Sequence, residues 1–153
     1  MSHARLALHL LMFGNTLLVC GVLLRIFSGR FAFDAPGLQG FLMLALPPAL
    51  SAQIATALRW RRIEWWARRP SGGWQAGIAL ALLTHVLFAV IMTVAAVVLK
   101  SSDSALLPAA AGAFFLLLFG SLLLGGGLSV PLSLLSAHWA ASRRRKELAH
   151  GVA

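Results

Sequence analysis

The chain has 153 residues, of which 59% are hydrophobic and 11% are charged, and its formal net charge at pH 7 is +9. Soluble domains carry about 25% charged residues, so this composition excludes an ordinary soluble domain and favours a membrane protein. A positive charge is also typical of nucleic-acid-binding proteins, but here the arginines lie beside long apolar runs. Anionic lipid headgroups are therefore the expected partner of these charges, and nucleic acid is not.

The chain length suits a single membrane domain, 1–153, because about 20 apolar residues cross a bilayer as a helix and four such crossings fit. The first predicted span covers 6–27. Its apolar run is longer than the roughly 7–15 residues of a signal peptide, and no A-x-A site follows it, so we expect a retained span. Cys20 is the only cysteine, which excludes an internal disulfide, and its place inside this span indicates a packing role.

The second predicted span covers 38–58 and contains Pro47 and Pro48 near its middle. Proline removes a backbone donor and crowds the preceding helical turn, so we expect a kink or a break at this point.

The connection that follows holds five arginines and three tryptophans within residues 59–70. Such residues at the edge of apolar runs mark a membrane–water interface, and clustered arginines mark its cytoplasmic side. On a helix the apolar side chains share one arc, which predicts a short interfacial amphipathic helix between the second and third spans. That arc consists of Trp60, Ile63, Trp66 and Ala67. The predicted headgroup contacts are Arg59, Trp60, Arg61, Arg62, Trp65, Trp66, Arg68 and Arg69. Anchoring is the expected role, with lipid sensing or partner docking as the alternative.

The third predicted span covers 74–99, and the fourth segment covers 105–139 without a single Asp, Glu, Lys or Arg. These 35 residues would extend about 52 Å as a helix, whereas the hydrocarbon core is about 30 Å thick. Glycines 125–127 and Pro131 therefore predict a kink or break near 125–131. The alternatives are a broken segment or one long kinked helix, followed by a basic cytoplasmic tail, 140–153.

The basic residues are divided unequally between the two predicted sides of the membrane. Ten fall on the side of the termini and the Arg/Trp connection, and three fall on the other, namely Arg25, Arg30 and Lys100. Positive charges in short loops stay inside, so both termini are expected in the cytoplasm and the number of spans is expected to be even. Eleven of the basic residues are arginine, which is associated with bacterial genomes rich in G and C, and we expect a bacterial inner membrane protein.

The fourth segment carries small side chains every four residues, which form one ridge on a helix. Such a ridge lets another backbone approach closely. It is either an interface with another subunit or a packing surface within the chain's own bundle. The ridge consists of Ser121, Gly125, Ser129, Ser133 and Ala137. Gly73 and Gly77 repeat the spacing at the start of the third span.

Three histidines, His9, His85 and His138, lie in or near the predicted spans and are the candidates for axial haem b ligands. Ligands of one haem should lie at similar depth. At helical rise, His9 lies about 5 Å inside the span and His85 about 16 Å inside, while His138 lies at the rim. This mismatch disfavours haem, so we expect no cofactor and no metal, and we expect His85 to bond a neighbouring helix.

No Asp or Glu lies in a predicted span, which disfavours carboxylate-based hydrolysis, two-metal catalysis and cation-coupled antiport. The buried polar candidates are Asn15, Gln39, Gln53, Thr56 and Thr93. The sequence therefore predicts an all-α bundle of four spans in two hairpins, with no enzymatic activity. The expected role is an accessory, assembly or scaffold subunit that binds another membrane protein or itself. A small oligomeric transporter or channel is the alternative, and a haem-bearing electron carrier is the third possibility.

Overall fold

The structure, a computed structural model, describes residues 2–28, 35–69, 72–99 and 106–151. Within these ranges it consists of helices and contains no strand. The helices are α1 (His3–Ser28), α2 (Ala35–Ala67), α3 (Gly72–Leu99) and α4 (Leu106–Ala149). The predicted all-α class is confirmed for this part of the chain.

Three of these helices are long and apolar enough to cross a membrane, over His3–Ile26, Gly73–Val98 and Ala110–Ala149. The described residues of α2 do not form a stretch that is both long and apolar enough by the same criterion. A membrane crossing by α2 therefore stays a prediction. The chain is thus an all-helical protein with apolar helices of membrane-spanning length.

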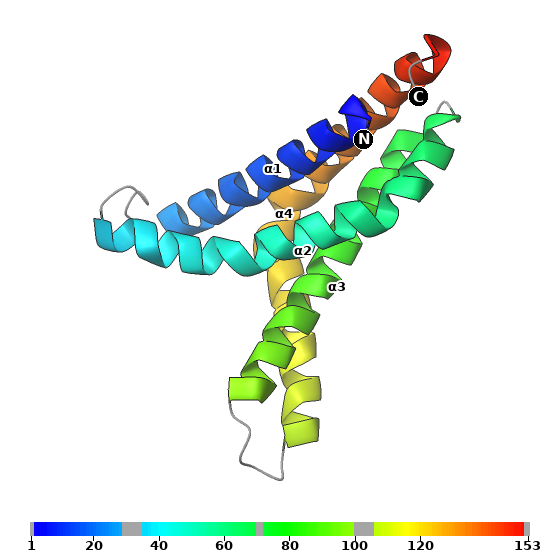
Figure 1. Ribbon diagram of the computed structural model, residues 1–153. Coiled ribbons are helices and arrows are strands. Elements are labelled where there is room, and N and C mark those ends of the chain that lie inside the picture. The colour runs from blue at the N-terminus through cyan, green and yellow to red at the C-terminus, as the bar shows by residue number, and fades with distance from the viewer. Residues whose placement is uncertain (1, 29–34, 70–71, 100–105, 152–153) are drawn as a thin grey trace.

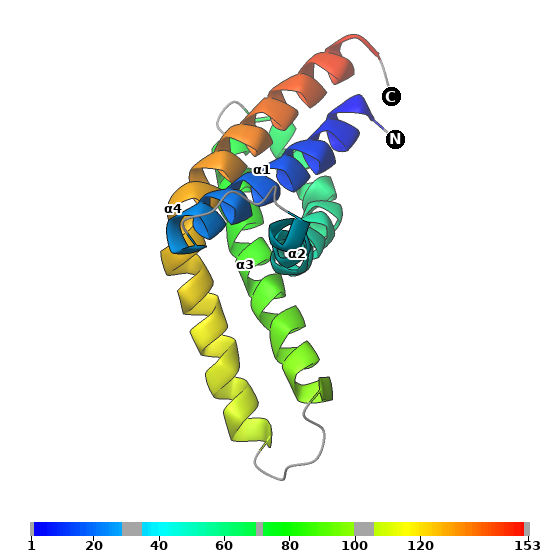
Figure 2. The ribbon, with the colours of Figure 1, turned by 90° about the vertical axis from the view of Figure 1, so that its left-hand side faces the viewer.

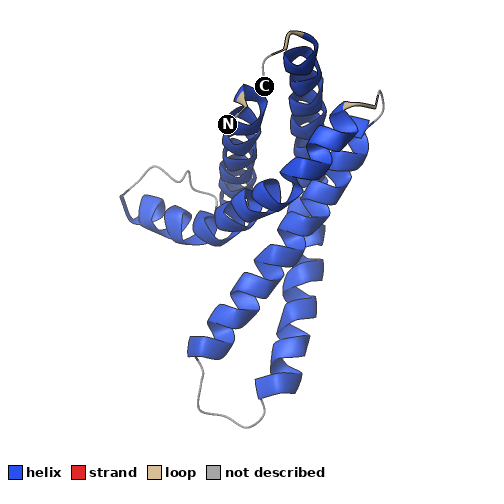
Figure 3. Cartoon of the chain, turned by 45° about the vertical axis from the view of Figure 1, so that its right-hand side comes forward, coloured by secondary structure: helices blue, strands red, loops and turns tan. Residues whose placement is uncertain are grey.

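The helices form two hairpins, α1 with α2 and α3 with α4 (Figure 1). The start of α1, the end of α2, the start of α3 and the end of α4 lie at one end of the molecule, which we call the bundle end (Figures 1 and 2). Beyond it the hairpins diverge, and the far halves of α3 and α4 stand apart from α1 and α2 (Figure 3). The hydrophobic core lies towards the bundle end, where alanines of all four helices surround Leu8, Ile63 and Leu80.

Both helices that contain proline continue through it. Pro47 and Pro48 lie inside α2, and Pro131 lies inside α4. Figure 1 shows α2 changing direction along its length, and Figure 2 shows α4 bending where its colour passes from yellow to orange. The fourth segment is therefore one bent helix of 44 residues, because the loss of one backbone donor bends a packed helix without ending it.

The Arg/Trp connection is helical, but it forms the last turns of α2 instead of a separate short helix. No glycine or proline interrupts the chain between Pro48 and Pro70. Proline disfavours the helical conformation of the residue that precedes it. Accordingly, α2 ends at Ala67, shortly before Pro70. The helix therefore extends beyond the predicted second span, 38–58, towards the bundle end.

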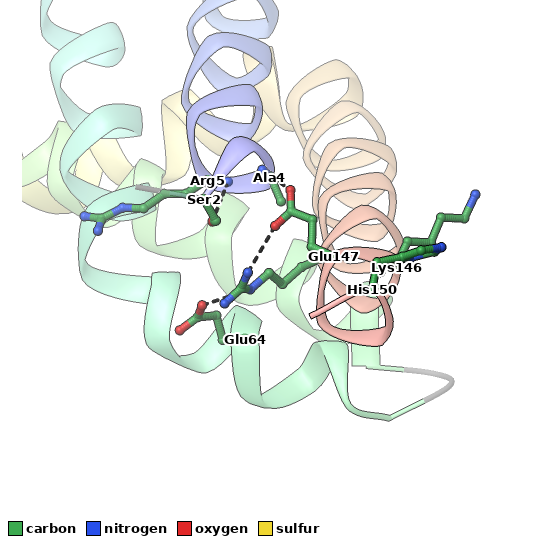
Figure 4. A network of polar contacts seen from close by, with 8 residues as sticks. Ser2, Ala4, Arg5, Glu64, Lys146, Glu147 and His150 are labelled. Carbon is green, nitrogen blue, oxygen red and sulfur yellow. Dashed lines mark hydrogen bonds and ion pairs between the residues drawn. The ribbon is translucent and has the colours of Figure 1, made fainter. Parts of the chain in front are cut away.

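A network of polar contacts joins the helix ends at the bundle end (Figure 4). Glu147 of α4 accepts a hydrogen bond of 2.9 Å from the backbone N–H of Ala4, in the first turn of α1. Arg144 pairs with Glu147 and with Glu64 of α2, at 3.1 Å in each case. A carboxylate at a helix N-terminus compensates the free N–H groups there. One arginine and two carboxylates thus connect α1, α2 and α4.

Candidate functional site

The small-residue ridge of α4 lies inside the molecule, where it packs against α3. The α3 face opposite carries its own row of buried residues with the same spacing, namely Gly73, Gly77, Ala81, His85 and Ala89. A Cβ added at Gly77 would lie 2.5 Å from the Cα of Leu134, and one added at Gly73 would lie 2.8 Å from the Cα of His138. Two rows with four-residue spacing interlock closely. The ridge therefore serves packing within the chain, and a partner would have to use another surface.

His85 lies in the middle of this α3–α4 interface and contacts two serines of the α4 ridge. Its Nδ1 is 3.0 Å from the hydroxyl of Ser121, and its Nε2 is 2.8 Å from the hydroxyl of Ser129. The hydroxyl of Ser121 donates its only proton to the carbonyl of Leu118, at 2.9 Å. It must therefore accept from His85 Nδ1–H. A neutral imidazole has a single N–H, so Nε2 accepts and Ser129 donates.

A cavity of about 450 Å³ lies beside His85, between the two hairpins. All four helices contribute to its wall, which is mostly apolar. Its polar residues include Asn15, Thr16, Thr84, His85, Ser121 and Ser129. No Asp, Glu, Lys or Arg is among the described residues that line it. This volume falls in the range of about 300–1,000 Å³ that is usual for ligand pockets.

The other two histidines lie in separate contacts. His9 Nδ1 lies 2.7 Å from the amide oxygen of Gln53, to which it donates, and the Gln53 amide donates to the His9 carbonyl at 3.1 Å. His138 stacks on Trp74, with ring centroids 4.9 Å apart. The structure brings none of the three histidines together, and the described residues contain no cluster of three potential metal ligands.

The predicted headgroup residues divide between the inside and the outside of the bundle. The apolar arc faces the core, because Ile63 and Ala67 are fully buried and Trp60 is only 6% exposed. Trp65 is exposed and lies beneath the guanidinium of Arg69, at 3.9 Å from the ring centroid. The arc that suggested a helix lying on lipid thus packs against the other helices, while Trp65 and most of the arginines stay exposed.

Asn15, a predicted buried polar residue, donates hydrogen bonds to the Ser136 hydroxyl at 2.8 Å and to the Leu132 carbonyl at 3.3 Å. Sequence reasoning missed Ser136, because it lies outside the four-residue repeat. It also missed Thr16 as a cavity residue. The spacing of residues along one helix could not reveal the roles of Ser136 and Thr16, since these roles depend on how α1 crosses α4. The side chain of Gln39 lies outside the described residues.

The described part of the chain is thus all-helical, with three helices long and apolar enough to cross a membrane and a mostly apolar pocket between its hairpins. Comparisons with protein-family models, with curated proteins and with solved structures found no match.

Proposed function

We propose that the chain is a four-span protein of the bacterial inner membrane with both termini in the cytoplasm. The segments that carry ten of its basic residues meet at the bundle end, since α1 begins there and α2 and α4 end there (Figure 1). Arg25 lies in the last turn of α1, at the opposite end of that helix. Arg30 and Lys100, also assigned to the far side, lie outside the described residues. This distribution supports a cytoplasmic bundle end, because basic residues stay inside.

Cysteine labelling tests this topology. In a Cys20→Ala background, Ala149→Cys near the end of α4 is expected to react with a membrane-impermeant maleimide in inverted inner-membrane vesicles but not in intact spheroplasts. Ile26→Cys, at the far end of α1, serves as the opposite control. Labelling of Ala149→Cys in intact spheroplasts would reverse the proposed orientation.

Within this topology we propose a non-enzymatic accessory, assembly or scaffold subunit that binds an apolar helix of another membrane protein. The observation that carries the proposal is a row of exposed side chains along α3, with the four-residue spacing of helix-packing ridges. We call this row the α3 ridge, and it consists of Ile78, Leu82, Val86, Val90, Val94 and Val98. It is separate from the buried row of small residues that packs on α4.

The composition of the α3 ridge suits helix–helix contact. Helix association in lipid depends on van der Waals packing between well-matched surfaces. Valine and isoleucine in a helix already occupy one side-chain rotamer, so they lose little conformational entropy when a partner covers them. A second apolar helix is therefore the occupant that this ridge fits.

Val90→Trp is expected to remove the partner from the purified complex, because an indole in the middle of the ridge holds a second helix away. Native mass spectrometry of the membrane extract measures the complex, and we expect at least about a tenfold loss, equivalent to about 1.4 kcal/mol. Leu123→Trp is the matched control, since Leu123 is 83% exposed on α4 and is not part of the ridge.

Two outcomes would contradict this proposal. A lone monomer released from mild detergent extracts of the unsubstituted protein would show that no partner is bound. A homodimer sensitive to Val90→Trp would show that the ridge binds a second copy of this chain instead of another protein.

A further inference from the structure

The cavity beside His85 differs from the α3 ridge because polar groups of three helices converge on it. It is lined by residues of both hairpins, and His85 is near the middle of α3. Its volume of about 450 Å³ corresponds to about 15 atoms of the size of a water molecule, at about 30 Å³ each. A linear ligand with about 15 non-hydrogen atoms has the size of a single-chain lipid-like molecule. Since the described lining residues include none with a permanent charge, a neutral ligand fits better than an ionised one.

Five hydroxyl groups line the cavity. Four of them have their protons committed to other acceptors, and the fifth, Ser133, can still donate to a ligand. Thr16 donates to the carbonyl of Met12 at 2.8 Å, and Thr84 donates to the carbonyl of Leu80 at 2.9 Å. Ser121 donates to a backbone carbonyl, and Ser129 donates to His85 Nε2, as argued above. A hydroxyl has one proton and two lone pairs. These four groups therefore offer a ligand hydrogen-bond acceptors and no donor.

Two further groups in the cavity wall add to this excess of acceptors over donors, namely the amide oxygen of Asn15 and the backbone carbonyl of Leu44. Both amide hydrogens of Asn15 serve hydrogen bonds to α4, which leaves its oxygen as an acceptor. Leu44 and Pro48 both line the cavity from α2. Proline has no N–H to give to the carbonyl four residues earlier, so Pro48 provides no helical donor for the carbonyl of Leu44. Apart from the Ser133 hydroxyl, the cavity wall thus combines apolar surface with hydrogen-bond acceptors, so acceptors outnumber donors.

We propose that this cavity binds a neutral lipid-like molecule that carries a hydrogen-bond donor, such as a long-chain alcohol or a phenol with an apolar tail. Its hydroxyl group donates to the acceptors near His85, and its hydrocarbon part fills the apolar remainder. A ketone, an ester or an ether of the same size has no proton to donate and fits less well. This site is independent of the α3 ridge, so either proposal can fail without the other.

The contact between Ser129 and His85 also has the distance of a nucleophile and its base, but the surroundings favour binding over acyl transfer. Acyl transfer needs N–H donors directed at the developing oxyanion. Ser129 lies inside the continuous helix α4, where backbone N–H groups are used by the helix itself. The backbone groups that Pro48 and Pro131 leave without donors are carbonyls, which repel an oxyanion.

The test compares two probes of equal size, tetradecan-1-ol and 1-methoxytridecane, on the full chain in detergent micelles. Native mass spectrometry counts the bound probe per chain. We expect one alcohol per chain, and about tenfold weaker retention of the ether because it lacks the donated hydrogen bond. Equal retention of both probes, or retention of neither, would overturn the proposal.

Two glycines of α4 supply a matched pair of variants. A Cβ at Gly120 or at Gly127 would meet nothing within 4 Å, but only Gly120 lines the cavity. Gly120→Leu is expected to fill the cavity and abolish retention of tetradecan-1-ol, and Gly127→Leu is expected to retain it. Retention by a folded Gly120→Leu chain would place the alcohol elsewhere and reject this site. If that variant fails to fold, the comparison of the two probes on the unsubstituted chain decides.

Discussion

Gly77→Ala is expected to destabilise the protein by about 2 kcal/mol, although it adds only one methyl group. The added Cβ would lie 2.5 Å from the Cα and 3.0 Å from the backbone nitrogen of Leu134. Carbon atoms in contact lie about 3.5–4.0 Å apart, so α3 and α4 would have to separate. Overpacking of this kind costs about 1–3 kcal/mol or more. The better helix propensity of alanine offsets at most about 1 kcal/mol of it.

Reversible unfolding in mixed micelles measures this effect, and Gly127→Ala is its control. A Cβ at Gly127 meets nothing within 4 Å, so only the helix propensity changes and the variant is expected to gain up to about 1 kcal/mol. Opposite signs for the two substitutions would confirm the close contact of α3 with α4. A neutral or stabilising effect of Gly77→Ala would show that the two backbones lie further apart.

Arg144→Met is expected to destabilise the bundle end by roughly 2–3 kcal/mol. It leaves Glu64 and Glu147 facing each other without the cation between them, and the side chain of Glu147 is only 11% exposed. Breaking a fully buried ion pair costs about 3–5 kcal/mol. The cost here is smaller because the side chain of Glu64 is 35% exposed, so that solvent screens its charge.

Hydrogen exchange locates this second effect, in addition to the unfolding measurement. Glu147 accepts the N–H of Ala4, so faster exchange is expected in the first turn of α1 as the carboxylate shifts. Arg143→Met is the control in the same helix, because Arg143 lies over the exposed ring of Trp139 and its loss should cost at most about 1 kcal/mol. Adding Glu147→Gln to Arg144→Met should recover part of the stability. Equal losses for Arg143→Met and Arg144→Met would reject the network.

The positions of the helices follow closely from the apolar runs. The first span was predicted at 6–27 and α1 covers His3–Ser28, while the third was predicted at 74–99 and α3 covers Gly72–Leu99. These limits are local, because apolar runs continue as helix until glycine, proline or polar residues interrupt them. The helix α2 continues beyond the predicted second span, 38–58, to Ala67, since arginine and tryptophan mark an interface without ending a helix.

The periodicity of small residues also identified a packing surface, but not what it packs against. The repeat that includes Gly125 and Ser129 is visible in the sequence, whereas its position against α3 depends on how the second hairpin closes. The same holds for the arc of Trp60 and Ile63, which looks alike whether lipid or protein covers it. Amphipathic spacing shows that a face is apolar, and only the neighbouring helices show what covers it.

The sequence by itself determined the all-helical class, the approximate limits of the long apolar helices and the concentration of basic residues in three segments. Only the tertiary structure decided that His85 lies between Ser121 and Ser129, that Arg144 joins two carboxylates, and that a cavity with acceptors separates the hairpins. The physical reason is the range of the interactions. Helix formation and interfacial anchoring depend on neighbours within a few turns. A polar group in an apolar interior must instead find its partner on another helix, and the crossing of the helices selects that partner.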